Sequence, residues 1–437
     1  MTSRETFGSR FGSVMALMGV AVGLANVWRF PYMAGSYGGA AFVALYVLFG
    51  IVLGVPAIMA EWTLGRMSRN GPAGAFVSVG MPGGRGIGMV LFFTVFMANT
   101  YYSLVVGQVL FYVFETMFGG GAGEAPVAFF EANLTGITAW NVSFTAVTFV
   151  GIAAVLHLGV RRGIESASRI IVPLVFLALL AVIARSVTLP GAEAGIRFFL
   201  LPDLSKVGPE TALAALGQVF FSLSLGGTFF LVYGSYLPKE ANIPVTAIQT
   251  AGGDLAAAVL GGLAILPAVF AMGVEPTSGP SLLFITLPPV FAAMPGGTIV
   301  GGIFFGALFL AAFLSAIAAM EVLVDGVRHY FGWSRTRALM VLVPIQLLVA
   351  LPSMFSQRIL QWNDLVWGST MQPIGSALTL IALGFFVSRG KALAEINQGS
   401  SIGIGAFWIF WIRWVIPTAI LVILVSGWWP TLRQLFE

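Results

Sequence analysis

The chain has 437 residues, of which 58% are hydrophobic and only 9% are charged, and its mean hydropathy is +0.96. About a quarter of the residues in a soluble domain are charged, so this composition excludes a globular protein surrounded by water and indicates a lipid environment. The net charge of +4 does not indicate nucleic-acid binding, because the chain has no lysine-rich run, and the absence of cysteine excludes structural disulfides and cysteine-ligated metal sites.

Apolar runs long enough to cross a bilayer as helices, about 20 residues each, occur eleven times. In chain order they cover residues 11–36, 41–65, 87–117, 141–159, 166–187, 213–237, 244–273, 299–327, 336–353, 367–388 and 404–428. The first run has no small-residue cleavage pattern, so we do not expect a cleavable signal peptide. The connecting segments leave no room for a soluble domain, and residues 1–437 are expected to form a single membrane domain.

Lysine and arginine are distributed unevenly between the two sets of alternating connections. Fourteen lie on the side of the N-terminus and five on the other side, while Arg29 and Arg413 lie within spans. Because cytoplasmic connections carry the excess of basic residues, the N-terminus is expected in the cytoplasm. With eleven spans, the C-terminus is then extracytoplasmic.

The first span is rich in glycine at its centre, over Gly19–Asn26, and the sixth span is similar over Phe221–Thr228. Two such segments, five helices apart, are typical of transporters built from inverted repeats that bind their solute near the middle of the membrane. Glycines that allow close helix packing are the alternative interpretation.

A helix that unwinds in the membrane exposes backbone polar groups, which must then face a cavity or a ligand. In the first span, carbonyl groups near Gly19, Ala21 and Val22 could bind a hard cation. The N–H groups near Gly23 and Ala25, at the start of the next half-helix, suit a carboxylate. Side-chain oxygens are also present in the two segments, on Asn26, Ser222 and Ser224.

Ionisable residues within spans are costly and therefore suggest function. Asp254, inside the seventh span, needs a cation or a hydrogen-bond donor, and we favour a sodium ligand. Glu61 is open to two interpretations, as a carboxylate that caps or packs helices or as part of transport. The same two roles are open for Glu321, which could simply hydrogen-bond to neighbouring helices.

Several motifs identify a family resemblance. The run Gly23–Tyr32 resembles the first-helix signature of the neurotransmitter:sodium symporter family, and Gln218–Gly226 with Tyr233–Tyr236 resembles its sixth helix. The further matches are Glu61-Trp62 with Gly65-Arg66, Tyr101-Tyr102, Gly163 to Pro173, Phe284–Pro288, and Ala311–Phe313 followed by Ser315–Ile317. They follow the family's order and cover essentially the whole chain.

The resemblance implies an all-α integral membrane protein with about eleven helices, arranged as a five-plus-five inverted repeat with broken helices 1 and 6. The repeats would cover about 11–187 and 213–388, with an additional helix over about 404–428. The missing twelfth span is typical of some bacterial members and implies a bacterial plasma membrane. The oligomeric state is not implied.

The resemblance also implies two sodium sites and no organic cofactor. The first would use Ala21, Asn26, Ser222 and Asp254 together with the substrate carboxylate. Asp254 stands where many members have asparagine, and its charge would replace the chloride that animal members bind near the position of Ala258. The second site would use Gly19, Val22, Ala311 and Ser315. Leu314 replaces the usual threonine there, which removes one oxygen and is expected to weaken the site.

The implied substrate is an amino acid. Members that carry amines have an aspartate at the position of Gly23, so a substrate of this chain should supply its own carboxylate. The implied binding residues are Val20, Ala21, Gly23, Ala25, Ala98, Tyr102, Phe221, Ser222, Ser224, Gly227, Ser315 and Ala319. Relatives often have large residues at Gly227 and Ala319, so we expect a bulky hydrophobic or aromatic side chain, although Ala25 in place of the usual glycine argues against it.

The resemblance implies a gate on each side of the site. Arg29 and Asp364 would pair when the outer vestibule closes, with a static ion pair as the alternative. The inner gate would use Arg4, Ser235 and Tyr236. His329 replaces the usual aspartate partner of Arg4, and Asp325, one turn earlier, could substitute for it. Phe7 replaces a tryptophan, which favours a looser inner gate.

The predicted mechanism is sodium-driven alternating access, in which the stretch from Gly163 to Pro173 unwinds to admit water to the second sodium site. A betaine is the first alternative substrate, but it would require an aromatic cage, and the implied pocket provides only Phe221 and Tyr102. A sensor or channel on the same fold is the second alternative. An enzyme is disfavoured, because no nucleophile–base pair or metal cluster recurs at membrane depth.

Overall fold

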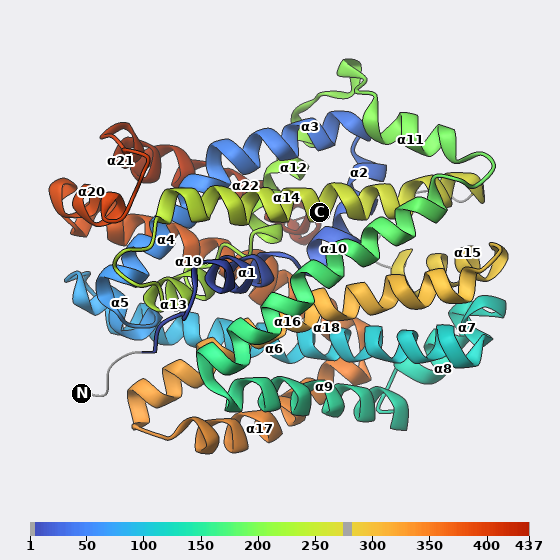
Figure 1. Cartoon of the computed structure of the whole chain (residues 1–437), viewed down its shortest axis with the longest axis horizontal. Coiled ribbons are helices and arrows are strands. Elements are labelled where there is room, and N and C mark those ends of the chain that lie inside the picture. Colours follow the sequence, from blue (N-terminus) through green and yellow to red (C-terminus); the bar gives the residue numbers. More distant parts are fainter. Residues whose placement is uncertain (1–4, 274–281, 437) are drawn as a thin grey trace.

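The structure, a computed structural model, describes residues 5–273 and 282–436, and the secondary structure assigned within these ranges is helical (Figure 1). Nine helices in the described ranges are long and apolar enough to cross a membrane. A bent pair, α1 (Arg10–Ala21) with η1 and α2 (Ala25–Ser36), adds a tenth span. A second interrupted pair, α12 (Pro209–Ser222) and α13 (Phe229–Ser235), corresponds to the predicted sixth span.

The helices follow the predicted order. After the first broken span come α3 to α4 (Ala40–Ser68), α5 (Pro72–Ser78), α6 (Gly84–Phe114), α7 (Gly121–Glu124), α8 (Pro126–Leu134), α9 (Ala139–His157), η4 (Val160–Glu165), α10 (Ser166–Ser186) and α11 (Ala192–Leu200). After the second come α14 (Ile243–Ala271), α15 (Leu287–Ala293), α16 (Gly297–Phe331), α17 (Arg335–Phe355), α18 with η7, α19 and η8 (Gln357–Phe386), α20 (Arg389–Asn397), α21 (Phe407–Phe410), η9 (Trp411–Val415) and α22 (Ile416–Phe436).

Both predicted helix breaks are confirmed. In the first span, Val22 adopts an extended conformation, with φ −70° and ψ 113°, and the two half-helices differ in direction by 52°. In the second, Ser224 and Gly227 have φ values of 52° and 64°. This left-handed conformation cannot continue an α-helix, and it is uncommon for residues other than glycine. The chain therefore crosses each break as irregular backbone.

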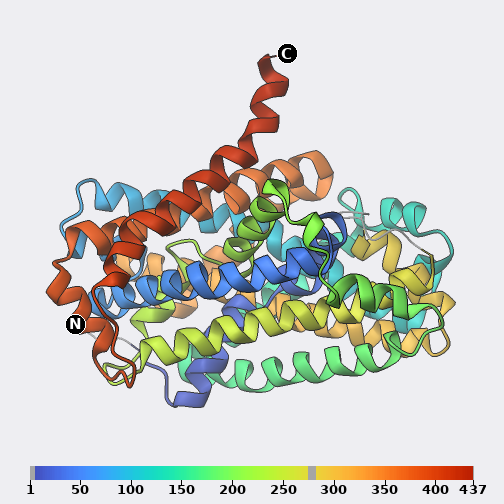
Figure 2. The same ribbon diagram turned by 90° about the horizontal axis from the view of Figure 1, so that it is seen from above.

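The long helices run roughly along the long axis of the molecule (Figure 1). The N-terminal segment lies at the same end as α5 and α20, and α7, α8, α11 and α15 lie at the opposite end. Seen from above, the last helix, α22, projects away from the bundle (Figure 2). The helices differ in burial: more than half of the apolar window is buried in α6, α14 and α16, but only a third or less in the spans that contain α9, α10 and α22.

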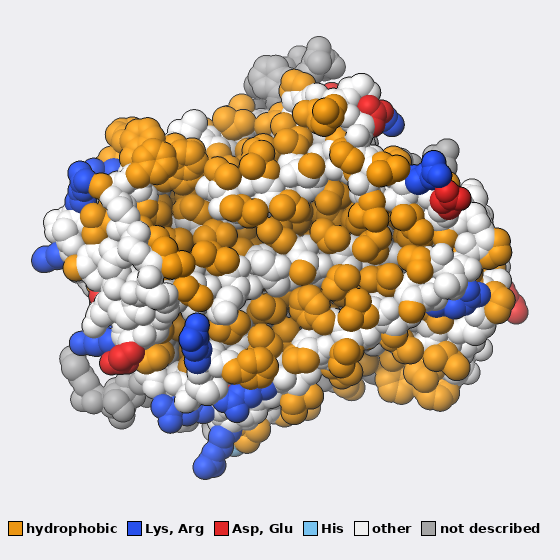
Figure 3. All heavy atoms as spheres, turned by 45° about the horizontal axis from the view of Figure 1, so that its top comes forward, with side chains coloured by type: hydrophobic (Ala, Val, Ile, Leu, Met, Phe, Trp, Pro, Cys, Tyr) orange, Lys and Arg blue, Asp and Glu red, His pale blue; other side chains and the backbone are white. Residues whose placement is uncertain are grey.

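The exposed surface fits a membrane protein. Hydrophobic side chains cover the middle of the face seen in Figure 3, and lysine and arginine side chains gather toward its ends. Large apolar residues on the outer helices, such as Val150, Ile170 and Met340, are exposed. In water these side chains would be costly to expose, so they identify the lipid-facing surface.

One predicted boundary differs from the structure, and one predicted rearrangement, the unwinding near Gly163, stays a prediction. The predicted span 367–388 is wrong at its start, because the helix begins at Gln357 and places Asp364 inside it. Its first residues are too polar for a hydropathy window to include, since several of them face a cavity. The stretch from Gly163 to Pro173 is helical in this conformation, and Pro173 lies within α10.

Candidate functional site

A buried cluster of polar side chains surrounds Asp254, which α14 places opposite both helix breaks. Ser222 Oγ lies 2.9 Å from each carboxylate oxygen of Asp254, so its single hydrogen can be donated to either. Asn26 Nδ2 donates to Asp254 Oδ1 at 2.7 Å, and the Tyr46 hydroxyl donates to Oδ2 at 3.0 Å. The ion pairs found in the described residues do not include Asp254. A buried carboxylate held only by neutral donors has the chemistry of a cation ligand.

Asn26 connects this cluster to the first break. Its Oδ1 accepts a hydrogen bond from the Gly23 N–H at 2.9 Å, and its Nδ2 also donates to Ser222 Oγ and to the Asp254 carbonyl, each at 3.0 Å. The structure thus brings three of the four residues predicted for the first sodium site into direct contact. The fourth, Ala21, lines the adjacent cavity beside Ser222.

Sequence reasoning missed two residues of this cluster. Tyr46, from the second span, contacts both Asp254 and Ser222. Gln218, from the sixth span, donates to the Ala25 carbonyl at 3.0 Å. Each is a polar side chain within a predicted span, and no feature of the sequence distinguishes it from the other polar residues of that span.

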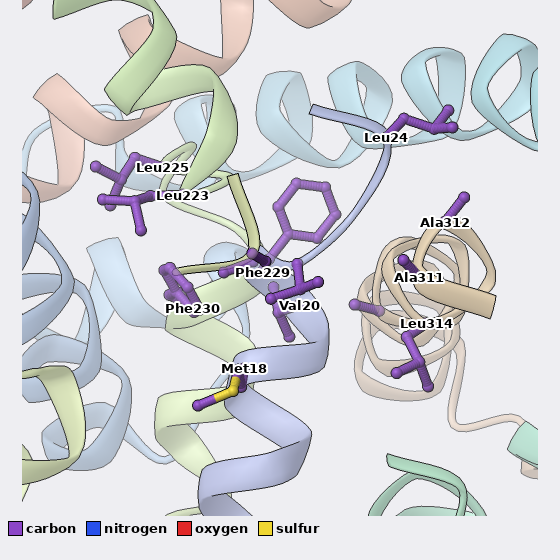
Figure 4. Close-up of a cluster of buried hydrophobic side chains, with 14 of the residues drawn as sticks. Met18, Val20, Leu24, Leu223, Leu225, Phe229, Phe230, Ala311, Ala312 and Leu314 are labelled. Atoms are coloured by element: carbon purple, nitrogen blue, oxygen red, sulfur yellow. The ribbon is translucent and has the colours of Figure 1, made fainter. Parts of the chain in front are cut away.

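The residues predicted for the second sodium site lie where α1 meets α16. Ser315 Oγ donates to the Val20 and Val22 carbonyls, at 3.4 Å each. Gly19 faces Leu314, because a Cβ atom placed on Gly19 would lie 2.9 Å from Leu314 Cδ1. Figure 4 shows Val20 at the end of α1, facing the α16 helix that carries Ala311 and Leu314. The apolar side chain of Leu314 therefore lies beside the backbone that was predicted to bind a cation.

A cavity of about 410 Å³ lies between the two breaks. This volume is within the range of small-molecule sites. Eleven of the twelve predicted substrate-binding residues lie on its wall: Val20, Ala21, Gly23, Ala25, Ala98, Tyr102, Phe221, Ser222, Ser224, Ser315 and Ala319. The hydroxyl of Ser224 donates to the Val20 carbonyl at 3.2 Å, which joins the two breaks at the cavity.

Gly227 is the exception, and the prediction that it enlarges the pocket is wrong. It does not line the cavity, and a Cβ atom placed on it would lie 2.2 Å from the Gly375 carbonyl oxygen and 2.4 Å from Thr379 Oγ1. The left-handed backbone at Gly227 turns this position toward α19. The glycine is therefore required by close packing and not by the size of a ligand.

Gly23 lies at a crowded point of the cavity wall. A Cβ atom placed on it would lie 2.7 Å from Ser315 Oγ and 3.1 Å from the Tyr102 hydroxyl. The Tyr102 hydroxyl is also close to the backbone of Leu24. Two hydroxyl groups and the backbone at a helix break thus converge where no side chain fits, and these groups can bind a carboxylate.

The cavity extends from the breaks to Arg29 and Asp364. The Arg29 guanidinium stacks on Phe221, with Cζ 4.1 Å from the ring centroid, and the Tyr101 hydroxyl donates to Asp364 Oδ1 at 3.1 Å. No ion pair joins Arg29 to Asp364 in the part of the chain that the structure describes. The predicted outer gate is therefore unpaired in this conformation.

The cavity is more aromatic than expected. The sequence-based pocket contains only Phe221 and Tyr102, whereas eight aromatic residues line the cavity. These are Trp28, Tyr32, Tyr101, Tyr102, Phe130, Phe221, Phe229 and Phe284. The expectation of only two aromatic residues is wrong, because the implied binding set left out rings from the wider part of the cavity, although Trp28, Tyr32, Tyr101 and Phe284 stand in the family motifs.

The opposite end of the molecule is sealed by a charged network. Glu321, which is buried, accepts a hydrogen bond from the Tyr236 hydroxyl at 2.7 Å and from both terminal nitrogens of Arg335, at 2.5 and 3.0 Å. Arg335 and Arg328 also pair with Glu5, at 3.1 and 3.3 Å. Glu321 therefore links neighbouring helices, one of the two roles that the sequence left open.

Glu5 is held as an anion in this network. Burial alone raises the pKa of its carboxyl group, but the hydrogen bond from the Val160 N–H and the charges of Arg335 and Arg328 outweigh burial. The net effect is a pKa lowered from 4.5. Glu5 therefore remains charged at neutral pH.

A short strap, residues 5–9, closes the same end. Glu5 anchors its start, and Glu165 anchors its end by accepting hydrogen bonds from the Gly8 N–H at 2.6 Å and the Ser9 hydroxyl at 2.8 Å. Between them, Phe7 is buried, with ring centroids 6.1 Å from those of Tyr233 and Tyr236. The strap thus packs between the sixth span and the start of the fifth.

The other predicted inner-gate residues have mixed outcomes. Tyr236 belongs to the charged network, and the Ser235 carbonyl accepts a hydrogen bond from Arg69 at 3.1 Å. Arg4 lies outside the described residues, so its partner stays a prediction. Asp325 faces the segment at Gly71, because a Cβ atom placed there would lie 2.5 Å from its Oδ2.

Comparison with known proteins connects this geometry to a family. The model described as the sodium:neurotransmitter symporter family matches residues 4–120 and 130–432. An uncharacterized sodium-dependent transporter of Bacillus subtilis, YhdH, is 33% identical, over 96% of this chain and 97% of its own. The sodium-dependent serotonin transporter of Drosophila melanogaster is 26% identical, over 97% of this chain and 76% of its own.

Among solved structures, the crystal structure of MhsT in complex with L-phenylalanine is similar throughout. The TM-score is 0.88 at 34% sequence identity, and the match covers 97% of this chain and 100% of MhsT. The similarity therefore includes both breaks and the helices around the cavity.

Proposed function

The chain belongs to the sodium:neurotransmitter symporter family, and from this premise we propose that it imports an amino acid with a large hydrophobic or aromatic side chain. It is a sodium-dependent symporter and a multi-pass membrane transporter. The observation that carries the proposal is the crowded backbone at Gly23, where the hydroxyls of Ser315 and Tyr102 leave no room for a side chain. A substrate must bring its own carboxylate to this position.

The rest of the cavity favours a large apolar side chain. Small residues, Ala98 and Ala319, form part of a wall that otherwise includes eight aromatic rings. A substrate with a small side chain would leave this space empty and would lose dispersion contacts with the wall. The similar structure of MhsT is a complex with L-phenylalanine, which supports the same class of substrate.

We further propose that one sodium ion binds at the first site, formed by Ala21, Asn26, Ser222 and Asp254. In the structure the Asn26 amide nitrogen faces Asp254, at 2.7 Å from Oδ1. A cation at this point would replace that donor as the partner of the carboxylate. Because Asp254 already supplies a fixed negative charge, transport is expected to be independent of chloride. The substrate carboxylate adds a second charge, so sodium and substrate bind with mutual coupling.

A second sodium ion is proposed at the Gly19, Val22 and Ala311 carbonyls with Ser315. Leu314 makes this site poorer in oxygen than the first, and its methyl group lies close to Gly19. A weaker, partly hydrated ion is the expected result. The sodium requirement then depends chiefly on the site at Asp254.

The difference between the two ends of the cavity supports alternating access. The end near Arg29 and Asp364 has no ion pair between these residues, while the opposite end is closed by Glu5, Arg335 and Glu321. Transport requires the first end to close and the second to open. We propose that the second end faces the cytoplasm of a bacterial cell, in agreement with the excess of lysine and arginine on the N-terminal side.

The decisive test is uptake by purified protein in liposomes under an inward sodium gradient. Labelled tryptophan, phenylalanine and leucine should accumulate saturably, with potassium unable to replace sodium and gluconate able to replace chloride. Uptake of glycine or alanine, unaffected by an excess of tryptophan, would contradict the proposed substrate class. A current that does not saturate would indicate a channel.

A betaine is the second candidate, because the eight aromatic residues of the cavity could surround a quaternary ammonium group. The same liposomes discriminate between the two. Competition of labelled phenylalanine uptake by glycine betaine, at concentrations where leucine has no effect, would favour the betaine.

A further inference from the structure

A second buried acid, Glu61, lies at the other helix break and outside the proposed sodium sites. α4 (Val55–Ser68) places its side chain beside the irregular backbone of the sixth span, with no exposed surface. Glu61 Oε1 accepts a hydrogen bond from the Gly227 N–H at 3.0 Å. Its other oxygen, Oε2, is buried without a hydrogen-bond partner, and the ion pairs of the described residues do not include Glu61.

The surroundings of Glu61 contain unused hydrogen-bonding capacity but no charge. Ser376, on α19, is close enough to interact with the carboxyl group, yet its hydroxyl oxygen has no hydrogen-bond partner. The hydroxyl oxygen of Thr228, the residue after Gly227, is buried and also without a partner. Buried hydroxyl groups normally find partners, so Ser376 is available to hydrogen-bond with the unpartnered Oε2 of Glu61, while no cation among the described residues balances a charge on this carboxyl group.

Asp254 provides the contrast within the same molecule. It is equally buried, but three side chains donate hydrogen bonds to its carboxylate. Asp254 does not line the main cavity itself, but Ser222, which is hydrogen-bonded to it, does. Within the described ranges, Glu61 has only backbone donors, the Gly227 N–H at 3.0 Å and the nearby backbone of Gly226, and neither it nor Gly227 lines the main cavity or the smaller one beside Arg29.

We propose that Glu61 is a proton-binding site and that its neutral carboxylic acid holds the break of the sixth span. An isolated carboxylate is too costly to bury, and a group in this position takes up a proton instead. The protonated acid accepts from the Gly227 N–H through Oε1 and donates from Oε2 to the Ser376 hydroxyl. A single proton thus satisfies Oε2 and gives Ser376 a partner.

Infrared difference spectroscopy on purified transporter in lipid tests this directly. The difference between wild type and Glu61→Gln should show the C=O stretching band of a protonated carboxylic acid, and this band should shift in heavy water. Glu193→Gln is the matched control, because Glu193 is exposed and paired with Arg197. Its difference spectrum should show only the bands of an ionised carboxylate. The same ionised-carboxylate bands in the Glu61→Gln difference would overturn the proposal.

The readout does not depend on the proposed substrate, since no transport is measured. Sodium-driven uptake gives a second measurement: Glu61→Gln should stay within about threefold of wild type, because glutamine is also neutral and offers both a donor and an acceptor. Loss of uptake by a folded Glu61→Gln protein would mean that a charge is needed and would refute the proposal.

A third variant keeps the test decisive if Glu61→Gln does not fold. Ser376→Ala removes the acceptor of the proposed hydrogen bond and should shift the carboxylic-acid band of Glu61 to higher frequency. A spectrum with no such band in wild type, or a band that Ser376→Ala leaves unchanged, would rule out the proposed geometry.

Discussion

The hydroxyl of Tyr46 donates a hydrogen bond to Oδ2 of Asp254 at 3.0 Å and contacts Ser222 Oγ at the same distance. This contact brings the second span into a cluster that otherwise belongs to the first, sixth and seventh spans. Tyr46 is fully buried, so no water can replace its hydroxyl. The position of the Asp254 carboxylate is thus fixed from a helix that contributes no predicted ligand.

Tyr46→Phe should weaken sodium binding without preventing folding. A lost hydrogen bond to a charged group costs about 1.5–3 kcal/mol, and the carboxylate would retain Ser222 and Asn26 as donors. We expect the sodium concentration for half-maximal uptake to rise at least about tenfold. Tyr37→Phe is the control, because Tyr37 stacks on Phe42 outside the cluster. An unchanged sodium dependence in Tyr46→Phe would show that Asp254 is positioned without it.

Asp254→Asn tests the proposed independence of chloride. The variant keeps the size of the side chain but removes its charge, so sodium should bind at least about tenfold more weakly. If the carboxylate replaces a bound anion, some uptake should return when chloride replaces gluconate. Uptake is measured in both anions, with wild type as the reference. Equal activity of wild type and Asp254→Asn in gluconate would remove the proposed role.

Ala319→Leu and Gly227→Leu should have different effects. Ala319 lines the cavity, so the larger side chain of Ala319→Leu should narrow it. The ratio of tryptophan uptake to leucine uptake should fall by about tenfold. Gly227 packs against Gly375, so leucine there should lower the yield of folded protein. Competition assays and size-exclusion profiles measure the two effects. A folded Gly227→Leu protein with altered selectivity would contradict the placement of this residue.

Leu314→Thr should strengthen the second sodium site. The new hydroxyl would supply an oxygen where the structure has a methyl group near Gly19. We expect a steeper dependence of uptake on sodium concentration and a lower concentration for half-maximal uptake. Leu314→Val, which changes size but adds no oxygen, is the control. The same response in both variants would indicate relief of crowding instead of ion binding.

The end that Glu5 closes should weaken in acid. Its folded-state pKa lies below 4.5, so the stabilisation from its ion pairs is present above that value and is lost as the pH falls through the lower, folded-state pKa. Glu5→Gln should show the weakened closure at neutral pH and no further change in acid. The chain contains no cysteine, so Ser13→Cys, at a buried position one turn after the strap residue Ser9, can report opening through its rate of alkylation. A rate in Glu5→Gln equal to that of the parent Ser13→Cys protein at neutral pH would refute this account.

Much of the site could be predicted because its residues are unusual for membrane-spanning helices. Glycines in the middle of two spans, and a carboxylate inside a third, violate the ordinary pattern of a membrane helix, and these positions lead to Asn26, Ser222 and Asp254. Tyr46 and Gln218 carry no such periodic signal. Their importance depends on which helix faces which, and only the packed structure gives that information.

The errors have equally specific causes. Gly227 resembles a pocket residue in the alignment of motifs, but its left-handed backbone directs it toward α19. The helix that carries Asp364 begins earlier than expected, because a hydropathy window treats a cavity-facing polar turn as a connecting loop. Direction and solvent access inside the bundle are tertiary properties, and a single sequence does not encode them locally.

Because the first span is broken at Val22, α1 can rotate around the break as a rigid body. α1 contains 12 residues and is therefore roughly 18 Å long, with its free end at the strap that Glu5 and Glu165 hold. A rotation of about 10° around the break would move that end by about 3 Å, more than a hydrogen bond tolerates. A small change of the backbone at the break would therefore be enough to break the hydrogen bonds that hold the strap at the far end of α1.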